Sequence, residues 1–107
     1  MRLIGKLQLE EFWNGCPQAK KPLLRWVDIV QAAQWSSFAD IRRTFGSVDL
    51  YHNKGVSLIV FNIGGKKFRL TGSIQYVRKN STGTVVVTRI EKHPDYDKHN
   101  KGIRGAK

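Results

Sequence analysis

The chain has 107 residues, enough for one domain with a modest core and too few for a second fold. Hydrophobic residues make up 40% of it, so it can bury a core and need not be disordered, and no apolar run is long enough to span a bilayer. Lysine and arginine total 19 against 8 acidic residues, so the formal net charge is +11 and favours a polyanionic partner such as nucleic acid, the ribosome, a membrane surface or an acidic protein.

The first half of the chain predicts helices. After a short strand at 3–4, apolar residues recur at helical spacing until Gly15 and Pro17 end the helix, and they are Leu9, Phe12, Trp13 and Cys16. A second helix from about Pro17 to Gln34 presents one apolar face, made of Leu23, Trp26, Val27, Val30 and Ala33. A third, short helix begins at the capping-box-like spacing of Ser37 and Asp40, and its apolar residues are Phe38, Ile41 and Phe45.

From Val48 onward the period changes to two, which predicts strands at 48–51, 57–63, 66–76 and 84–90. Gly64-Gly65 is a hairpin signal between the second and third of these, and 80–83 is a turn cluster. We therefore expect an α+β fold, an antiparallel β-sheet with the N-terminal helices packed on one face. One domain is expected over 1–98, with 99–107 as a basic, mobile C-terminal tail.

The strand at 66–76 offers the first candidate site. Its alternation places Phe68, Leu70, Ile74 and Tyr76 on one face, and on the other Lys67, Arg69, Thr71, Ser73 and Gln75. Cations with hydroxyl and amide groups on one sheet surface suit a phosphate backbone, and Arg89 on the last strand can lie alongside. The alternative is an ordinary solvated sheet face. With Phe68 and Tyr76 facing the core, we expect no exposed aromatic platform on the cationic face.

The end of the last strand offers the second candidate. His93, Asp95, Tyr96 and Asp97 lie within five residues, and a histidine and a tyrosine beside a cationic sheet suit acid–base chemistry on RNA. The 2′-hydroxyl of the RNA would attack the adjacent phosphate, so no serine or cysteine nucleophile is required. The alternative is that His93 and Asp95 only cap the last turn.

Neither a metal nor another cofactor is expected. Cys16 is the only cysteine, so an internal disulfide and a cysteine-rich metal site are excluded. Asp95 and Asp97 could hold Mg²⁺ with His93, but Lys92 and Lys98 flank them and would repel a cation. The first residues lack the apolar stretch of a signal peptide, so a cytoplasmic location is expected, with no role at a membrane.

Several motifs together resemble the HigB toxins of type II toxin–antitoxin modules. They are Phe12-Trp13, Pro17, Pro22-Leu23, Trp26, Trp35, Phe45, the run from Phe61-Asn62-Ile63-Gly64-Gly65 through Lys66-Lys67 to Phe68-Arg69-Leu70, and the closing His93-Pro94-Asp95-Tyr96-Asp97. The resemblance covers almost the whole chain before the tail.

The resemblance implies a RelE/ParE-type fold and cleavage of mRNA, commonly on the translating ribosome, by metal-independent transesterification. It implies a HigA-type antitoxin with a helix-turn-helix domain, and contact with operator DNA only through that antitoxin. By position it assigns catalytic roles to Arg69, His93, Tyr96 and Asp97. The expected RNA-binding residues are Lys66, Lys67, Thr71, Ser73, Arg89 and Lys92.

Two positions depart from the family pattern. The residue before the histidine, often threonine, is here Lys92, and the position often held by a second arginine is Thr88, with Arg89 next to it. Arg89 then points to the opposite face of the sheet, unless a β-bulge restores its direction.

Three functions remain open at this point. The first is an endoribonuclease toxin, the second a non-catalytic basic module that binds RNA or the ribosome, and the third a gyrase-directed toxin of the same fold. The resemblance favours the first.

Overall fold

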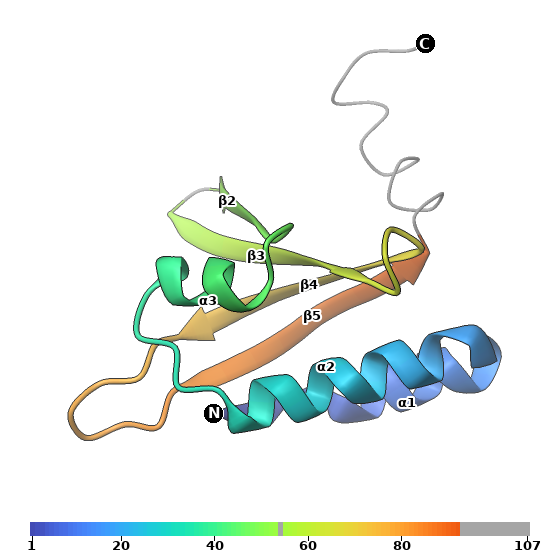
Figure 1. Cartoon of the computed structure of the whole chain (residues 1–107), viewed down its shortest axis with the longest axis horizontal. Helices are drawn as coiled ribbons and strands as arrows, with labels where there is room; N and C mark the ends of the chain where they lie inside the picture. The colour runs from blue at the N-terminus through green and yellow to red at the C-terminus, as the bar shows by residue number, and fades with distance from the viewer. Residues whose placement is uncertain (54, 93–107) are drawn as a thin grey trace, which may run out of the picture.

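The computed structural model describes residues 1–53 and 55–92 of the chain. In chain order the elements are β1 (Arg2–Ile4), α1 (Lys6–Gly15), the short 3-10 helix η1 (Pro17–Ala19), α2 (Lys20–Ala32), α3 (Phe38–Thr44), β2 (Asp49–Asn53), β3 (Val56–Ile63), β4 (Phe68–Gln75) and β5 (Thr84–Lys92) (Figure 1). The predicted α+β fold is confirmed.

The five strands form one sheet in the order β1-β5-β4-β3-β2. Strands β2 to β5 are an antiparallel meander, as the hairpin and turn signals predicted. The sheet is nevertheless mixed, because β1 pairs with β5 in parallel, with Leu3 opposite Val85. The whole helical segment and the meander separate these two strands in sequence, so β1 enters the sheet from a crossover rather than from a hairpin.

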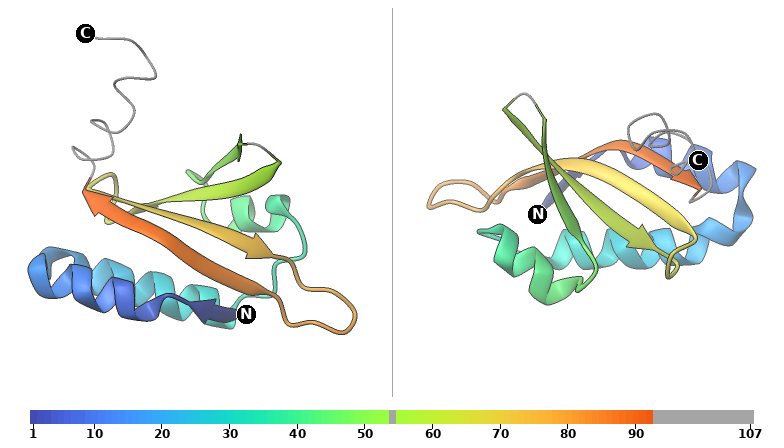
Figure 2. Two further views of the ribbon diagram at one scale, coloured as in Figure 1. Left: turned by 180° about the vertical axis from the view of Figure 1, so that it is seen from behind. Right: turned by 90° about the horizontal axis from the view of Figure 1, so that it is seen from above.

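All three helices lie on the same face of the sheet (Figure 2). Phe61 of β3 is the centre of the core they enclose: its ring lies 5.3 Å from that of Trp26 and 5.4 Å from that of Phe45, edge to face in both cases. Trp35 stacks on the same phenylalanine at 6.4 Å. The apolar stripes predicted for the helices therefore meet on one side, and they leave the other face of the sheet without a helix among the described residues. We call this second face the open face.

The element boundaries follow local chemistry. The predicted second helix is divided into η1 and α2, and Pro22 falls in the first turn of α2, where its missing N–H leaves no intrahelical bond unmade. Ser37 caps α3, as its spacing predicted, by accepting a bond from Asp40 N at 3.4 Å. The last strand continues to Lys92, beyond its predicted end, because β4 offers a partner as far as Phe68. No helix in the described ranges has the length and apolarity to cross a membrane.

Candidate nucleic-acid interface

The open face is composed of alternate residues of β2 to β5. Arg69, Thr71 and Ser73 lie on it, because Leu70 and Phe68, which alternate with them on β4, are buried in the core under the helices. The predicted division into two faces is therefore confirmed within β4, whereas Lys67, predicted on the polar face, lies in the turn before the strand. Directly opposite residues of neighbouring strands share a face, so Val60 and Asn62 of β3 lie beside Thr71 and Arg69.

A β-bulge decides which way Arg89 points. Val85 and Val87 are buried in the core, and strict alternation would send Arg89 into the core as well. The ladder instead passes from Gly72 opposite Val87 to Thr71 opposite Arg89, which leaves Thr88 as an extra residue. Arg89 consequently shares the open face with Thr71 and Arg69, and the second of the two directions considered from sequence is the correct one.

Gly72 makes room for this bulge. A Cβ at position 72 would lie 2.7 Å from the carbonyl oxygen of Val86, closer than real Cβ contacts come. A glycine inside a strand is a known sign of a bulge or a close backbone approach. The sequence therefore contained a signal for the direction of Arg89.

Arg69 is held by an amide that is itself anchored. Its Nη1 donates a hydrogen bond to Asn62 Oδ1, and Asn62 Nδ2 donates to the carbonyl oxygen of Ser47 at 3.2 Å. The guanidinium is thus tied through β3 to the backbone that precedes β2. This arrangement fixes the direction of the cationic group before any ligand arrives, which is what recognition of a phosphate requires.

Glu91 brings a carboxylate between the two arginines. Its Oε1 lies 2.8 Å from Arg89 Nε, which makes the two side chains a close ion pair. In the ladder Glu91 is directly opposite Arg69. The side chain of Glu91 is 11% exposed and that of Arg89 44%. Two guanidiniums and one carboxylate leave a net positive charge at this end of the open face.

Thr71 lies at the centre of the cluster but below its surface. The residue is 4% exposed, and its Oγ1 has no hydrogen-bond partner among the described residues. A hydroxyl without a partner in a buried position is costly. It is exposed too little to contact a ligand in this arrangement of the neighbouring side chains, whereas Ser73, two residues along, is partly exposed.

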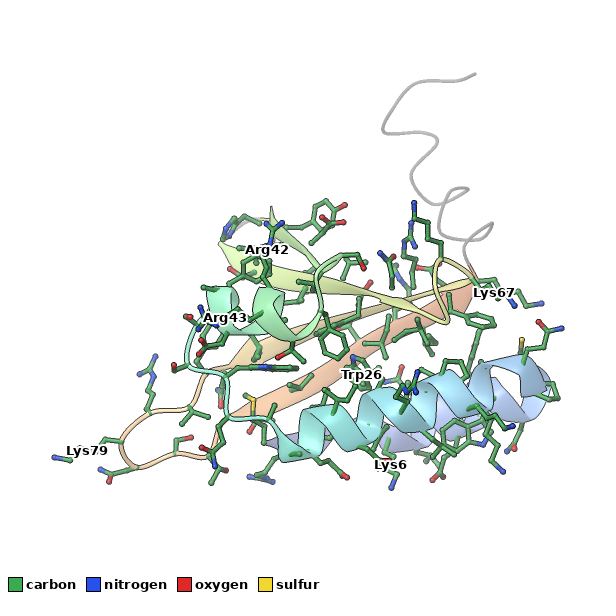
Figure 3. All side chains as sticks on the ribbon, viewed as in Figure 1. Lys6, Trp26, Arg42, Arg43, Lys67 and Lys79 are labelled. Atoms are coloured by element: carbon green, nitrogen blue, oxygen red, sulfur yellow. The ribbon has the colours of Figure 1, made fainter. Side chains whose placement is uncertain are left out.

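The lysines predicted to bind RNA lie at one end of the sheet. Lys66 and Lys67 are exposed in the turn between β3 and β4, and Lys92 is exposed at the end of β5, opposite Phe68. Figure 3 shows Lys67 beside the end of β5. The structure therefore brings these three lysines to the end of the sheet that also holds Arg69 and Glu91.

Other predicted residues lie outside the described ranges, and sequence reasoning missed three that lie within them. His93, Asp95, Tyr96 and Asp97, together with the tail at 99–107, are not described. The missed residues are Asn62, Glu91 and Tyr51. Asn62 and Glu91 could have been found as the polar residues that alternate along β3 and β5.

Tyr51 corrects the expectation that the cationic face has no exposed aromatic. It pairs with Leu58 on the open face and is 46% exposed. The expectation considered Phe68 and Tyr76 alone, and those two do pack against the core. The strand predicted at 48–51 extends to Asn53 rather than ending at Tyr51, so an aromatic residue lies in mid-strand on the edge of the sheet.

Comparison with known proteins supplies the family. The chain matches the family model described as HigB_toxin, the RelE-like toxic component of a toxin–antitoxin system, over residues 19–99, which is well over half of its length. The comparison with curated proteins finds no match. The matched segment includes α2 and the whole meander, and the meander provides the open face described above. The chain thus belongs to the HigB toxin family and is a toxin of a toxin–antitoxin system, with an antitoxin as its partner.

Proposed function

We propose that this toxin cuts mRNA by metal-independent transesterification on the open face of the sheet. The observation that carries the proposal is the bulge at Thr88, because it turns Arg89 onto the face that already holds Arg69. Two arginines at diagonal positions of neighbouring strands on an uncovered sheet face can bind one phosphodiester and the charge that develops on it. The formal net charge of +11 favours approach to a polyanion.

In the proposed reaction the RNA supplies its own nucleophile. The 2′-oxygen forms a bond to the adjacent phosphorus as a base takes its proton, and the bond from phosphorus to the 5′-oxygen breaks as an acid protonates that oxygen. The products are a 2′,3′-cyclic phosphate and a 5′-hydroxyl. Arg69, fixed by Asn62, stabilises the negative charge of the phosphorane.

The proton transfers are assigned to residues after β5. His93 directly follows Lys92, and Lys92 pairs with Phe68, the neighbour of Arg69 on β4. His93 and Tyr96 are the proposed acid and base, and Asp97 the group that orients them. Glu91 keeps Arg89 in place in the free protein. Lys66, Lys67, Arg89, Lys92 and Ser73 are proposed to bind the strand on either side of the cut.

The test combines end-group analysis with matched variants. Single-turnover cleavage of RNA should yield 2′,3′-cyclic phosphate or 3′-phosphate ends, and EDTA should leave the rate unchanged. His93→Gln or Tyr96→Phe should lower the rate by about 100- to 10,000-fold with nearly unchanged RNA affinity. Arg69→Ala should lower both the rate and the affinity, the latter by about 1–3 kcal/mol.

Arg78→Ala is the control for loss of a charge, because Arg78 lies in the connection between β4 and β5, beyond the end of β4. It should cleave at the parental rate. Products with 5′-phosphate ends, or activity abolished by EDTA, would remove the mechanism. A toxin directed at gyrase would leave RNA intact both with and without ribosomes and would inhibit supercoiling instead.

The partner and setting are proposed from the family. The antitoxin is a HigA-type protein with a helix-turn-helix domain, and the complex contacts operator DNA only through that domain. The toxin acts in the cytoplasm on mRNA that the ribosome presents. Expression of the toxin alone should arrest growth, and co-expression of the antitoxin should restore it. Unimpaired growth with intact toxin at high level would contradict the proposal.

A further inference from the structure

A cleft lies between the beginning of α2 and the turn that joins β3 to β4. Its volume is about 640 Å³, and its walls include Gln18, Lys21, Pro22 and Arg25 on one side and Gly64 and Lys67 on the other. The turn directly precedes β4, which carries Arg69 on the open face. The cleft therefore adjoins the end of the candidate interface. None of the residues assigned above to catalysis lines it.

The positive charge of this cleft is not balanced by an acidic side chain among its described lining residues. Lys21, Arg25 and Lys67 line it, no carboxylate does, and in the described ranges none of the three forms an ion pair. Lys21 and Arg25 are four residues apart on α2, so their side chains are neighbours on one helix face and repel each other. The first turn of α2 contains no acidic residue that would offset them. Such an uncompensated arrangement is typical of a binding site.

The cleft is held open by rigid contacts. Gly64 has a φ of 61°, and a Cβ built on it would lie 3.5 Å from Pro22 Cγ, so the turn lies against the helix at van der Waals distance. Phe68 at the base of the turn packs edge to face on Phe12 of α1, with ring centroids 5.7 Å apart. The cations on both walls are therefore presented by packed elements.

The residues that line the cleft suit the phosphate backbone of a nucleic acid better than its bases. Its one aromatic residue, Phe68, is 3% exposed and offers no surface on which a base can stack. Lysine and arginine side chains with one amide, that of Gln18, suit the oxygens of a phosphate backbone. Lys67 is the last residue of the turn and Arg69 is the second residue of β4, so both cations lie at the same end of β4. A strand that has one phosphate at Arg69 can therefore continue past Lys67 into the cleft.

We propose that this cleft is a second phosphate-binding subsite, in which Lys21, Arg25 and Lys67 hold the backbone of the RNA strand beyond the phosphodiester bound on the open face. The inference rests on the proposed function for its ligand. It adds a path: the RNA crosses the open face and leaves around the β3–β4 turn along the beginning of α2. Because only the backbone is held, the subsite contributes affinity without sequence preference.

The experiment compares two double variants that remove equal charge. Lys21→Ala/Arg25→Ala empties one wall of the cleft, and Arg78→Ala/Lys79→Ala removes two exposed cations from the connection between β4 and β5. Figure 3 shows Lys79 at the opposite end of the molecule from Lys67. The ligands are 2′-O-methyl RNAs, which cannot be cut: a trinucleotide, and a strand of about ten nucleotides.

We expect the cleft variant to bind the long RNA at least tenfold more weakly than the control variant, with equal affinities for the trinucleotide. The slope of log affinity against log salt for the long RNA should fall by about 1.4, because two contacts to single-stranded phosphates are lost. Lys21→Arg/Arg25→Lys keeps both charges and should bind the long RNA as the parent does. Equal thermal midpoints will show that the exposed substitutions leave the fold intact.

Four results would overturn the inference. The first is that the cleft and control variants bind the long RNA with equal affinity, and the second is that the cleft variant loses as much affinity for the trinucleotide as for the long RNA. The third is that inorganic phosphate competes as effectively as the RNA strand. The fourth is that the cleft variant binds RNA normally but no longer binds its antitoxin. Because the probe cannot be cut, these outcomes are independent of catalysis. If the toxin fails to cleave RNA and the length-dependent binding holds, the proposed function fails and the subsite stands.

Discussion

The covered face and the open face of the sheet are built from alternate residues of the same strands, yet the residues at the centre of each face are shielded from solvent by different groups. On the covered face Phe61 is enclosed by aromatic rings from α2, from the connection between α2 and α3, and from the residue that follows α3. On the open face Val60 and Thr71 are 5% and 4% exposed with no described helix above them. Neighbouring side chains must supply that cover, and Arg89 is directly opposite Thr71.

The difference separates stability from function. The covered face is apolar and densely packed, so its residues determine whether the chain folds. On the open face, charged side chains surround the buried pair Val60 and Thr71. This arrangement leaves the Thr71 hydroxyl without a hydrogen-bond partner among the described residues and brings Arg69, Arg89 and Glu91 together. Local rules broken in this way are expected at functional sites. Substitutions on the two faces should therefore affect different measurements.

The largest stability effect is expected at the centre of the covered face. Phe61→Ala should lower the free energy of unfolding by about 3–5 kcal/mol, because it leaves a cavity between Trp26, Trp35 and Phe45. Urea titration followed by tryptophan fluorescence will measure it. Ser73→Ala, on the open face of the neighbouring strand, should stay within about 0.5 kcal/mol. A similar loss for both variants would show that the two faces do not differ as described.

The covered face was also the predictable one. Period 3.6 in the helices and period two in the strands identified Leu23, Trp26 and Leu70 as core residues from sequence alone, because burial on that face follows directly from repeated spacing. The order of the meander followed from its glycine turns. The parallel addition of β1 did not, because three residues carry no signal for the strand they will pair with.

The open face was predictable only in part. Alternation placed Arg69, Thr71 and Ser73 correctly, but it left two directions open for Arg89, since direction there depends on a bulge. The bulge is a property of the pair formed by Gly72 and Val86, which are far apart in sequence. The depth of Thr71 likewise depends on side chains of neighbouring strands, so its pattern alone suggested a contact surface.

The second effect concerns the bulge and links the two faces. Gly72→Ala would place a Cβ 2.7 Å from a backbone oxygen, which cannot move without shifting β5. We expect a loss of about 1–3 kcal/mol in stability, together with a fall in RNA cleavage as Arg89 leaves its position. Gly46→Ala is the control, since nothing lies within 4 Å of its new Cβ. Full cleavage by a folded Gly72→Ala protein would contradict the role given to the bulge.

The third effect has opposite signs in the two regions. Thr71→Val replaces an unpartnered buried hydroxyl with a methyl group of similar shape, so stability should be unchanged or rise by up to about 1 kcal/mol. Thr44→Val removes the oxygen that accepts a bond from Trp35 Nε1 at 3.0 Å and should cost about 1 kcal/mol or more. Thermal unfolding of both variants gives the comparison.

RNA affinity adds a second readout for Thr71. At 4% exposure its hydroxyl does not reach a ligand, so Thr71→Val should bind RNA as the parent does. A loss of affinity without a loss of stability would mean that the arginines move apart on binding and expose the hydroxyl to a phosphate.

The smallest effect lies at the edge of the covered side and depends on pH. Two hydrogen bonds from Ser36, from its backbone N–H at 2.9 Å and from its hydroxyl at 2.8 Å, are the main cause that holds the pKa of Asp40 below its usual 3.8, with Arg43 adding to them. The folded state therefore favours the ionised carboxylate, and the stabilisation is present above pH 3.8 and is lost as the pH falls through the lower, folded-state pKa. Asp40→Asn should unfold at a slightly lower temperature than the parent near neutral pH, and the two midpoints should converge as the solution is acidified below that value. Asp28→Asn, an equal loss of charge at an exposed position of α2, should show no such convergence. A difference between Asp40→Asn and the parent that persists undiminished in acid would mean that the side chain acts through its shape at the start of α3 and not through its charge.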